Sequence, residues 1–162
     1  MSYTAEPGAL SEEVENIFDC DGREYHLEID YFFDKNCQSQ AIYFFLNRCE
    51  RNNRVGYAYC LIEDGNLKIA DFLIYDNQTF QSGIDKLFKL THWNEPTNYR
   101  NKTLGTQLLQ HIINVARRKG IHEIVGELTY EDRTQQPFLI GWYEKHGFTI
   151  DPKSYQIRFT LA

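Results

Sequence analysis

The segment Leu104–Lys119 constrains the fold of this 162-residue chain more than any other part of the sequence. Its apolar residues recur at helical spacing and its polar residues face the other way, which predicts an amphipathic helix. The basic cluster Arg117–Lys119 complements the negative C-terminal dipole, and Gly120 suits a left-handed cap. Because apolar, strand-like segments precede and follow this helix, we expect a right-handed crossover between two parallel strands.

Most of the remaining regular structure is predicted to be β. Apolar and polar side chains alternate along Glu24–Asp34, which indicates a half-buried strand. Three further strands with turn residues between them complete an expected antiparallel meander: Ala41–Arg48, Val55–Ile62 and Leu67–Tyr75. After the long helix we expect a fifth strand, a second helix opened by a proline, and two closing strands: Ile121–Thr129, Pro137–His146, Phe148–Ile150 and Ser154–Leu161.

The length of the chain favours a single domain over residues 1–162. Residues 1–16 are expected to form a loose N-terminal segment, with a short acidic helix over Pro7–Asn16 that Ser11 would cap. Residues 76–99 form a long connection before the amphipathic helix, with a short element expected at Ile84–Trp93. A connection of this length is usually functional or mobile in a compact domain.

Composition and charge exclude several classes of function. The net charge of −6 argues against nucleic acid as the main partner and slightly favours a cationic acceptor, although such a charge commonly serves solubility alone. No apolar run is long enough to span a bilayer and the N-terminus lacks a hydrophobic signal core, so the cytoplasm is the expected location. The spacing of the four cysteines and five histidines predicts no metal site. The oligomeric state stays open, with a homodimer among the options.

The segment Arg100–Thr106, which we call the phosphate loop, leads directly into the amphipathic helix. The first turn of a helix has backbone N–H groups without intrahelical partners and the positive end of the helix dipole, which together suit a phosphate. Gly105 lets a ligand approach the main chain, while Arg100 and Lys102 can add charge-assisted contacts. Periodicity alone therefore predicts an anion site on an α/β sheet.

Two motifs, in this order, resemble those of the GNAT N-acetyltransferase superfamily. The first is Arg100-x-x-x-x-Gly105-Thr106, and the second is the segment Trp142–Phe148, with the sequence Trp-Tyr-Glu-Lys-His-Gly-Phe. The family pattern is Arg or Gln, two residues, Gly, one residue, and Gly or Ala, so Thr103 occupies the first glycine position. Its N–H can still donate to a phosphate if the residue is helical rather than left-handed.

The resemblance implies both a fold and an activity. The fold would be a GNAT-like mixed β-sheet with antiparallel N-terminal strands and a central parallel pair splayed around acetyl-CoA, flanked by helices. The activity would be acetyl-CoA-dependent N-acyl transfer to a primary amine by direct attack. The implied cofactor-binding residues are Leu73, Ile74, Tyr75, Arg100, Asn101, Lys102, Thr103, Leu104, Gly105, Thr106 and Gln136.

The catalytic assignments that follow from the resemblance have alternatives. Tyr143 matches the family tyrosine that protonates the departing thiolate, but it could also be a packed aromatic residue. Glu127 is the first candidate for a general base, followed by Asp71 and Asp76, and each of them could instead be structural or solvent-facing.

The acceptor end of the site cannot be inferred from the resemblance. GNAT domains normally place two helices between the first and second strands, whereas here only a short turn separates Phe33 from Ala41. We expect the insertion at residues 76–99 to replace this wall, and His92 and Trp93 could line an acceptor pocket or anchor their own loop. A rival function is a non-catalytic acyl-CoA-binding or protein-interaction module on the same fold.

Overall fold

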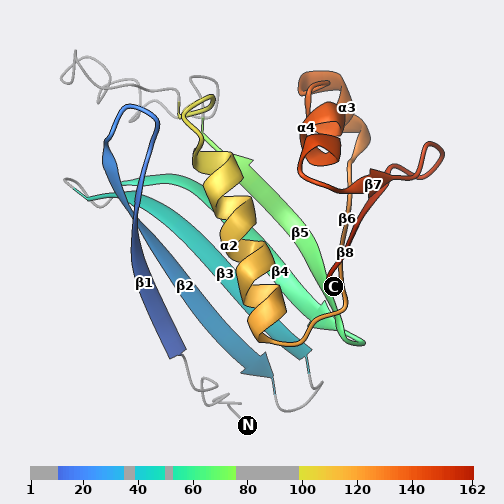
Figure 1. Ribbon diagram of the computed structural model, residues 1–162, viewed down its shortest axis with the longest axis horizontal. Coiled ribbons are helices and arrows are strands. Elements are labelled where there is room, and N and C mark those ends of the chain that lie inside the picture. Colours follow the sequence, from blue (N-terminus) through green and yellow to red (C-terminus); the bar gives the residue numbers. More distant parts are fainter. Residues whose placement is uncertain (1–10, 35–38, 50–52, 76–98) are drawn as a thin grey trace, which may run out of the picture.

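The computed structural model describes residues 11–34, 39–49, 53–75 and 99–162. These residues form an eight-stranded sheet in the order β1-β2-β3-β4-β5-β6-β8-β7, with helices packed against it (Figure 1). The strands are β1 (Ser11–Phe18), β2 (Glu24–Asp34), β3 (Ser39–Arg48), β4 (Arg54–Glu63), β5 (Asn66–Ile74), β6 (Glu123–Glu127), β7 (Thr149–Ile150) and β8 (Gln156–Thr160). The helices are α2 (Leu104–Arg118), α3 (Tyr130–Gln135) and α4 (Leu139–Lys145).

The sheet is mixed, as the sequence predicts. Strands β1 to β5 pair with their sequence neighbours in antiparallel register, and β8 is antiparallel to both β6 and β7. The β5–β6 pair is parallel, and α2 makes the connection between these two strands. The expected antiparallel N-terminal part and central parallel pair are therefore confirmed.

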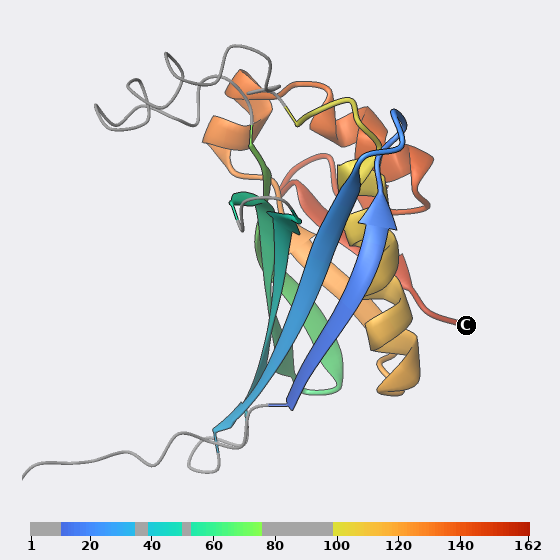
Figure 2. The ribbon, with the colours of Figure 1, turned by 90° about the vertical axis from the view of Figure 1, so that its left-hand side faces the viewer.

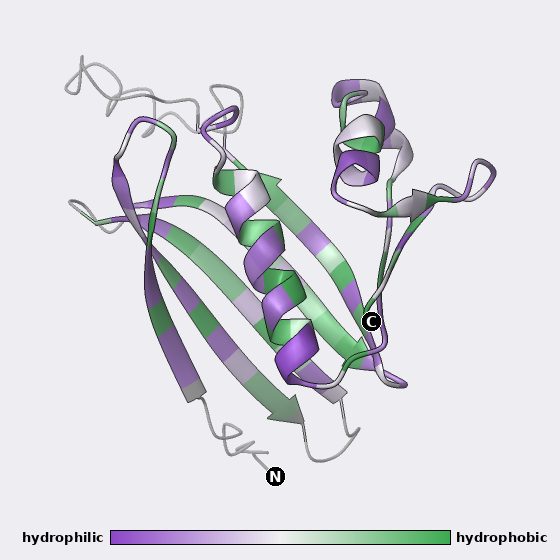
Figure 3. Ribbon diagram, in the orientation of Figure 1, coloured by the Kyte–Doolittle hydropathy of each residue, from purple (hydrophilic) through white to green (hydrophobic). Residues whose placement is uncertain are grey.

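Helix α2 lies along one face of the meander (Figures 1 and 2). Hydrophobic and hydrophilic bands alternate along the helix, as its sequence periodicity requires (Figure 3). Leu104, Leu108 and Ile112 are fully buried and belong to the same core cluster as Leu27 and Ile29 of β2. Full burial of such side chains is worth roughly 1.5–3 kcal/mol each, so α2 is firmly fixed on the sheet.

The expected acidic helix at the N-terminus is wrong over residues 11–16, which form most of β1. Pairing with β2 over its whole length gives this segment a sheet partner, and Ile17 is buried in the core. Glu13 and Glu15 reach Arg118 and His111 on α2. Tertiary pairing thus overrides the local helical signal. Residues 7–10 lie outside the described part of the chain.

The C-terminal helices also differ from the prediction. A further short helix, α3, follows β6, and its N-cap Thr129 forms a capping box with Asp132 that is visible in the sequence. The expected fifth strand ends earlier, at Glu127, and α4 begins at Leu139 rather than at Pro137. The expected element at Ile84–Trp93 lies outside the described residues. In the part of the chain that the structure describes, no helix is long and apolar enough to cross a membrane.

Candidate functional site

The parallel strands β5 and β6 pair over only part of their length. Their register runs from Asn66 opposite Glu123 to Ile69 opposite Gly126. Ala70 follows as a bulge without a partner on β4, because Ile69 and Asp71 pair with the consecutive residues Cys60 and Tyr59. β5 then continues to Ile74, whereas the chain after β6 turns away into α3. The hydrogen-bonded pairing of β5 with β6 therefore ends at the bulge. Beyond it, the edge of β5 that faced β6 has no neighbouring strand among the described residues and borders an opening in the sheet.

A cavity of about 350 Å³ lies beside this edge of β5. Its lining comes from β5, the phosphate loop, the first turn of α2 and the α3–α4 region: Phe72, Leu73, Ile74, Arg100, Asn101, Gly105, Gln136, Phe138, Leu139 and Trp142. The volume and the mixture of aromatic walls with a few polar groups are typical of a small-molecule site.

The structure brings several of the predicted cofactor-binding residues together at this cavity. Those that line it are Leu73, Ile74, Arg100, Asn101, Gly105 and Gln136. The others are not part of its lining: Tyr75, Lys102, Thr103, Leu104 and Thr106. Leu104 is instead fully buried in the core beneath α2, and Thr103 and Thr106 are exposed. The first turn of α2 thus contributes its backbone to the site more than its side chains.

The phosphate loop contains two non-glycine residues in the left-handed region. Asn101 has φ 58° and Thr103 has φ 67° and ψ −1°. The left-handed conformation costs about 1–2 kcal/mol for a non-glycine residue, and it is least suited to a β-branched one such as threonine. A helical conformation at Thr103 is therefore ruled out, and this residue adopts the shape that a glycine would take more readily.

Thr103 is the N-cap residue of α2, but its side chain makes no capping hydrogen bond. Its hydroxyl donates to the carbonyl oxygen of Lys102 instead. The backbone N–H groups of the first helical turn therefore have no side-chain cap competing for them. This arrangement, with the dipole of a 15-residue helix behind it, favours an anionic ligand.

The two cations of the phosphate loop make contacts within the protein. Arg100 lines the cavity, and its Nε donates to the carbonyl oxygen of Ile74 at 3.1 Å, which ties the loop to the end of β5. The ammonium group of Lys102 forms an ion pair with Asp21 in the β1–β2 turn. The hydrogen bond within this pair raises the pKa of Lys102 and lowers the pKa of Asp21.

Tyr143, the candidate acid, is 4% exposed and is not among the residues that line the cavity. Its ring packs edge-on against Trp142 and Phe148, with centroid distances of 4.9 and 5.2 Å. Burial raises the pKa of Tyr143, so its hydroxyl keeps its proton at neutral pH. A general acid must be protonated before the reaction, and Tyr143 meets this requirement. Its packing, however, is that of a core aromatic residue.

The candidate bases occupy different positions around the parting strands. Glu127 is exposed at the last residue of β6, immediately after the final parallel pair. Asp71 follows the bulge on β5, where it accepts hydrogen bonds from the Tyr57 hydroxyl at 2.8 Å and from the Phe72 N–H at 2.9 Å. Burial and the bond to Asp71 raise the pKa of Tyr57 to about 12. Asp76, His92 and Trp93 lie outside the described residues.

The sequence did not reveal the apolar walls of the cavity, which include Phe72, Phe138, Leu139 and Trp142. Trp142 follows Phe138 by four residues and Leu139 by three, which places the three on one side of a helical segment. The spacing is visible in the sequence, but it does not distinguish side chains that pack in the core from side chains that line a cavity. Among the described residues no group of His, Cys, Asp or Glu is arranged to hold a metal ion.

The sequence model of the acetyltransferase (GNAT) family matches residues 11–148 of this chain. No curated relative matches it in sequence. One similar solved structure is the PaiA N-acetyltransferase of Thermoplasma acidophilum in complex with coenzyme A. It is 13% identical, with a TM-score of 0.52, over 75% of this chain and 61% of that one. The chain therefore spans less than two thirds of that relative.

Two further solved structures show the same likeness. A GNAT acetyltransferase from Staphylococcus aureus Mu50 is 15% identical over 75% of this chain and 68% of its own, with a TM-score of 0.51. Gcn5 of Tetrahymena is 10% identical over 75% of this chain and 70% of its own, with a TM-score of 0.50. At these identities the likeness establishes the fold, and the site must be argued from its own residues.

Proposed function

Because the chain belongs to the acetyltransferase (GNAT) family, we propose that it is an acetyl-CoA-dependent N-acyltransferase that acetylates a primary amine by direct attack. The observation that carries this proposal is the cavity between the opened edge of β5 and the first turn of α2, with Gly105 in its wall. A similar fold holds coenzyme A in the Thermoplasma structure. We also propose that residues 1–162 act as one domain.

The proposed cofactor position follows from the chemistry of the walls. The pyrophosphate would bind the backbone N–H groups at the start of α2, near Arg100. The pantetheine chain carries amide groups and would run along the edge of β5 beyond Ala70, where backbone groups face the opening. Phe72, Leu139 and Trp142 would surround its apolar part and exclude water.

Acetyl-CoA supplies an activated acyl group, and the protein would supply the proton transfers and the orientation. Glu127 takes a proton from the acceptor ammonium, directly or through water, which leaves a neutral amine to attack the thioester carbon. A backbone N–H of β5 beside the bulge stabilises the developing negative charge on the carbonyl oxygen. As the carbon–sulfur bond breaks, Tyr143 gives its proton to the thiolate. The Tyr143 phenolate then takes the extra proton from the nitrogen of the former amine, so the products are a neutral amide and the free thiol.

A second candidate function is an acyl-CoA-binding or protein-interaction module that has lost transfer. Three observations favour it. Tyr143 is buried and does not line the cavity, and both carboxylate oxygens of Asp71 already accept hydrogen bonds from the protein. In addition, only residues 35–38 separate β2 from β3, so no pair of helices forms an acceptor wall between these strands.

Calorimetric titration with acetyl-CoA, followed by an assay of thiol release against a panel of primary amines, tests both candidates. The panel should include small aliphatic amines, lysine-containing peptides and free peptide N-termini. Binding with amine-dependent thiol release supports the transferase. Binding without turnover on any amine supports the module instead, and a chain that does not bind acetyl-CoA at all refutes both.

A further inference from the structure

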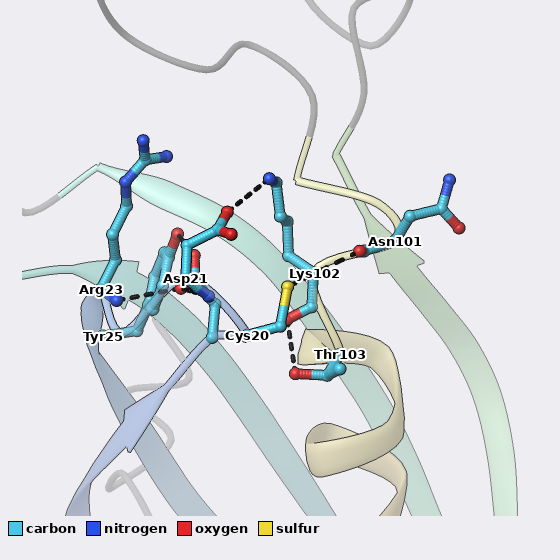
Figure 4. A network of polar contacts seen from close by, with 8 residues as sticks. Cys20, Asp21, Arg23, Tyr25, Asn101, Lys102 and Thr103 are labelled. Carbon is cyan, nitrogen blue, oxygen red and sulfur yellow. Dashed lines mark hydrogen bonds and ion pairs between the residues drawn. The ribbon is translucent and has the colours of Figure 1, made fainter.

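The turn between β1 and β2, residues 18–23, lies directly against the phosphate loop, although the two are 81 residues apart at their main contact (Figure 4). The backbone N–H of Cys20 donates to the carbonyl oxygen of Lys102 at 3.2 Å. The Lys102 ammonium pairs with Asp21 (Figure 4). The side-chain amide of Gln107, one turn into α2, donates to the carbonyl oxygen of Phe18. The thiol of Cys20 also contacts the carbonyl oxygen of Asn101 at 4.0 Å. Four contacts therefore join the turn to the loop and its helix.

The β1–β2 turn is itself stiff, because the carboxylate of Asp19 ties it together. Asp19 is 6% exposed, and its Oδ1 accepts from the backbone N–H groups of Asp21 and Arg23, each at 2.9 Å. Its Oδ2 accepts from the hydroxyl of Tyr25, also at 2.9 Å. The ring of Tyr25 in turn meets Tyr99, the residue before the loop, edge-on at 6.4 Å. A rigid turn can impose a shape on the segment it contacts.

The phosphate loop needs such support, because its own residues do not favour its shape. Lys102, which makes two of the four contacts, lies between Asn101 and Thr103, and both of these neighbours have a positive φ. Asparagine tolerates this conformation, but a β-branched residue such as Thr103 keeps it only where the surrounding structure imposes it. The family pattern has glycine at the position of Thr103, where the left-handed shape needs no such support.

We propose that the β1–β2 turn positions the phosphate loop for the cofactor. The turn holds the loop in its anion-binding conformation, which a glycine at position 103 would adopt without such support. Asp21, Cys20 and Phe18 act through Lys102 and Gln107 and do not touch the cofactor. This role depends on the proposed function, since it assumes that the loop binds CoA.

The test measures the affinity of the full chain for CoA by calorimetry. The variant D21A/Q107A removes the Asp21–Lys102 ion pair and the hydrogen bond from Gln107 to Phe18, and we expect its affinity to fall about tenfold, as the loss of two hydrogen bonds suggests. The matched control is E13A/E15A, which removes two other side-chain contacts between β1 and α2, those to Arg118 and His111. Because both are remote from the phosphate loop, this control should bind CoA within about twofold of the wild type.

The decisive measurement is rescue by glycine. Thr103→Gly in the D21A/Q107A background should recover most of the lost affinity, because glycine needs no support in the left-handed region. A general loss of folding would not be rescued in this way. If D21A/Q107A binds CoA like the wild type, or if Thr103→Gly recovers nothing, the positioning role is refuted. If the wild type itself does not bind CoA, the proposed function is refuted, and the positioning role of the β1–β2 turn is refuted as well.

Discussion

Gly105 at the start of α2 faces Trp142 of α4 across the wall of the cavity. A β-carbon on residue 105 would lie 3.6 Å from Cζ2 of the indole ring and 3.6 Å from Cγ1 of Ile74. Both distances are ordinary van der Waals contacts, so this position has room for a methyl group and for little more. A larger side chain at position 105 would therefore extend into the cavity where the first turn of α2 would meet its ligand.

Replacing Gly105 with Glu should abolish measurable CoA binding. The longer side chain would enter the cavity, and its charge would repel the phosphates, so we expect a loss of about 100-fold or more. Calorimetric titration with CoA measures the affinity of the variant. Gly105→Ala is the matched control and should fold and bind with only a small loss. Unchanged affinity in Gly105→Glu would remove the anion-site assignment.

Replacing Tyr143 with Phe should lower kcat by about 10- to 100-fold while KM for acetyl-CoA changes little, if the hydroxyl protonates the departing thiolate. Phe keeps the edge-on packing against Trp142 and Phe148, so the fold should be preserved. Steady-state kinetics of thiol release gives both constants. A kcat equal to that of the wild type would assign Tyr143 to the core alone.

Replacing Glu127 with Gln should lower kcat at neutral pH by roughly 100-fold, the lower range for a general base. The deficit should shrink as the pH rises towards the pKa of the acceptor amine, because a neutral amine no longer needs a base. The pH profile of kcat/KM therefore distinguishes this role from a structural one. Glu144→Gln, on the exposed side of α4, should leave the profile unchanged. A pH-independent deficit in Glu127→Gln would argue against the base assignment.

Replacing Gly56 with Ala should destabilise the fold by about 1–3 kcal/mol, the usual cost of overpacking. A β-carbon there would lie 2.7 Å from Cδ1 of Ile74 and 2.9 Å from the carbonyl oxygen of Leu73, so β4 and β5 would have to move apart. Urea unfolding measures the change. Gly141→Ala is the control, because no atom lies within 4 Å of its added carbon, and it should be neutral or stabilising.

The free energy of unfolding should fall as the pH rises above 10. Burial is the main cause that raises the pKa of Tyr31 and of Tyr57 from 10.0 to about 12. Between pH 10 and pH 12 the unfolded chain releases protons that the folded chain retains. The contribution of each tyrosine to the free energy of unfolding is therefore full below pH 10 and is lost by about pH 12. Urea unfolding at pH 9 and pH 11 tests this. Tyr57→Phe should flatten the decline, and an equally steep decline would contradict the assignment.

The meander and the long helix could be predicted because their signals are local. Alternation along β2 and helical spacing in α2 each come from residues a few positions apart, and both elements lie where the sequence predicts them. β1 could not be predicted in this way, since its acidic residues carry a helical signal until β2 and α2 supply partners. Helix α3 was predictable from its capping box and was overlooked.

The sequence by itself determined that an anion site is predicted at the phosphate loop, because a glycine and two cations before an amphipathic helix favour one without any tertiary contact. Only the tertiary structure decided where β5 and β6 part, which aromatic side chains wall the cavity, and that Thr103 is left-handed against the β1–β2 turn. The physical reason is the distance along the sequence over which each interaction acts. Propensities and helix dipoles act within a few residues, whereas strand pairing, burial and imposed backbone strain depend on segments that meet only in the folded chain.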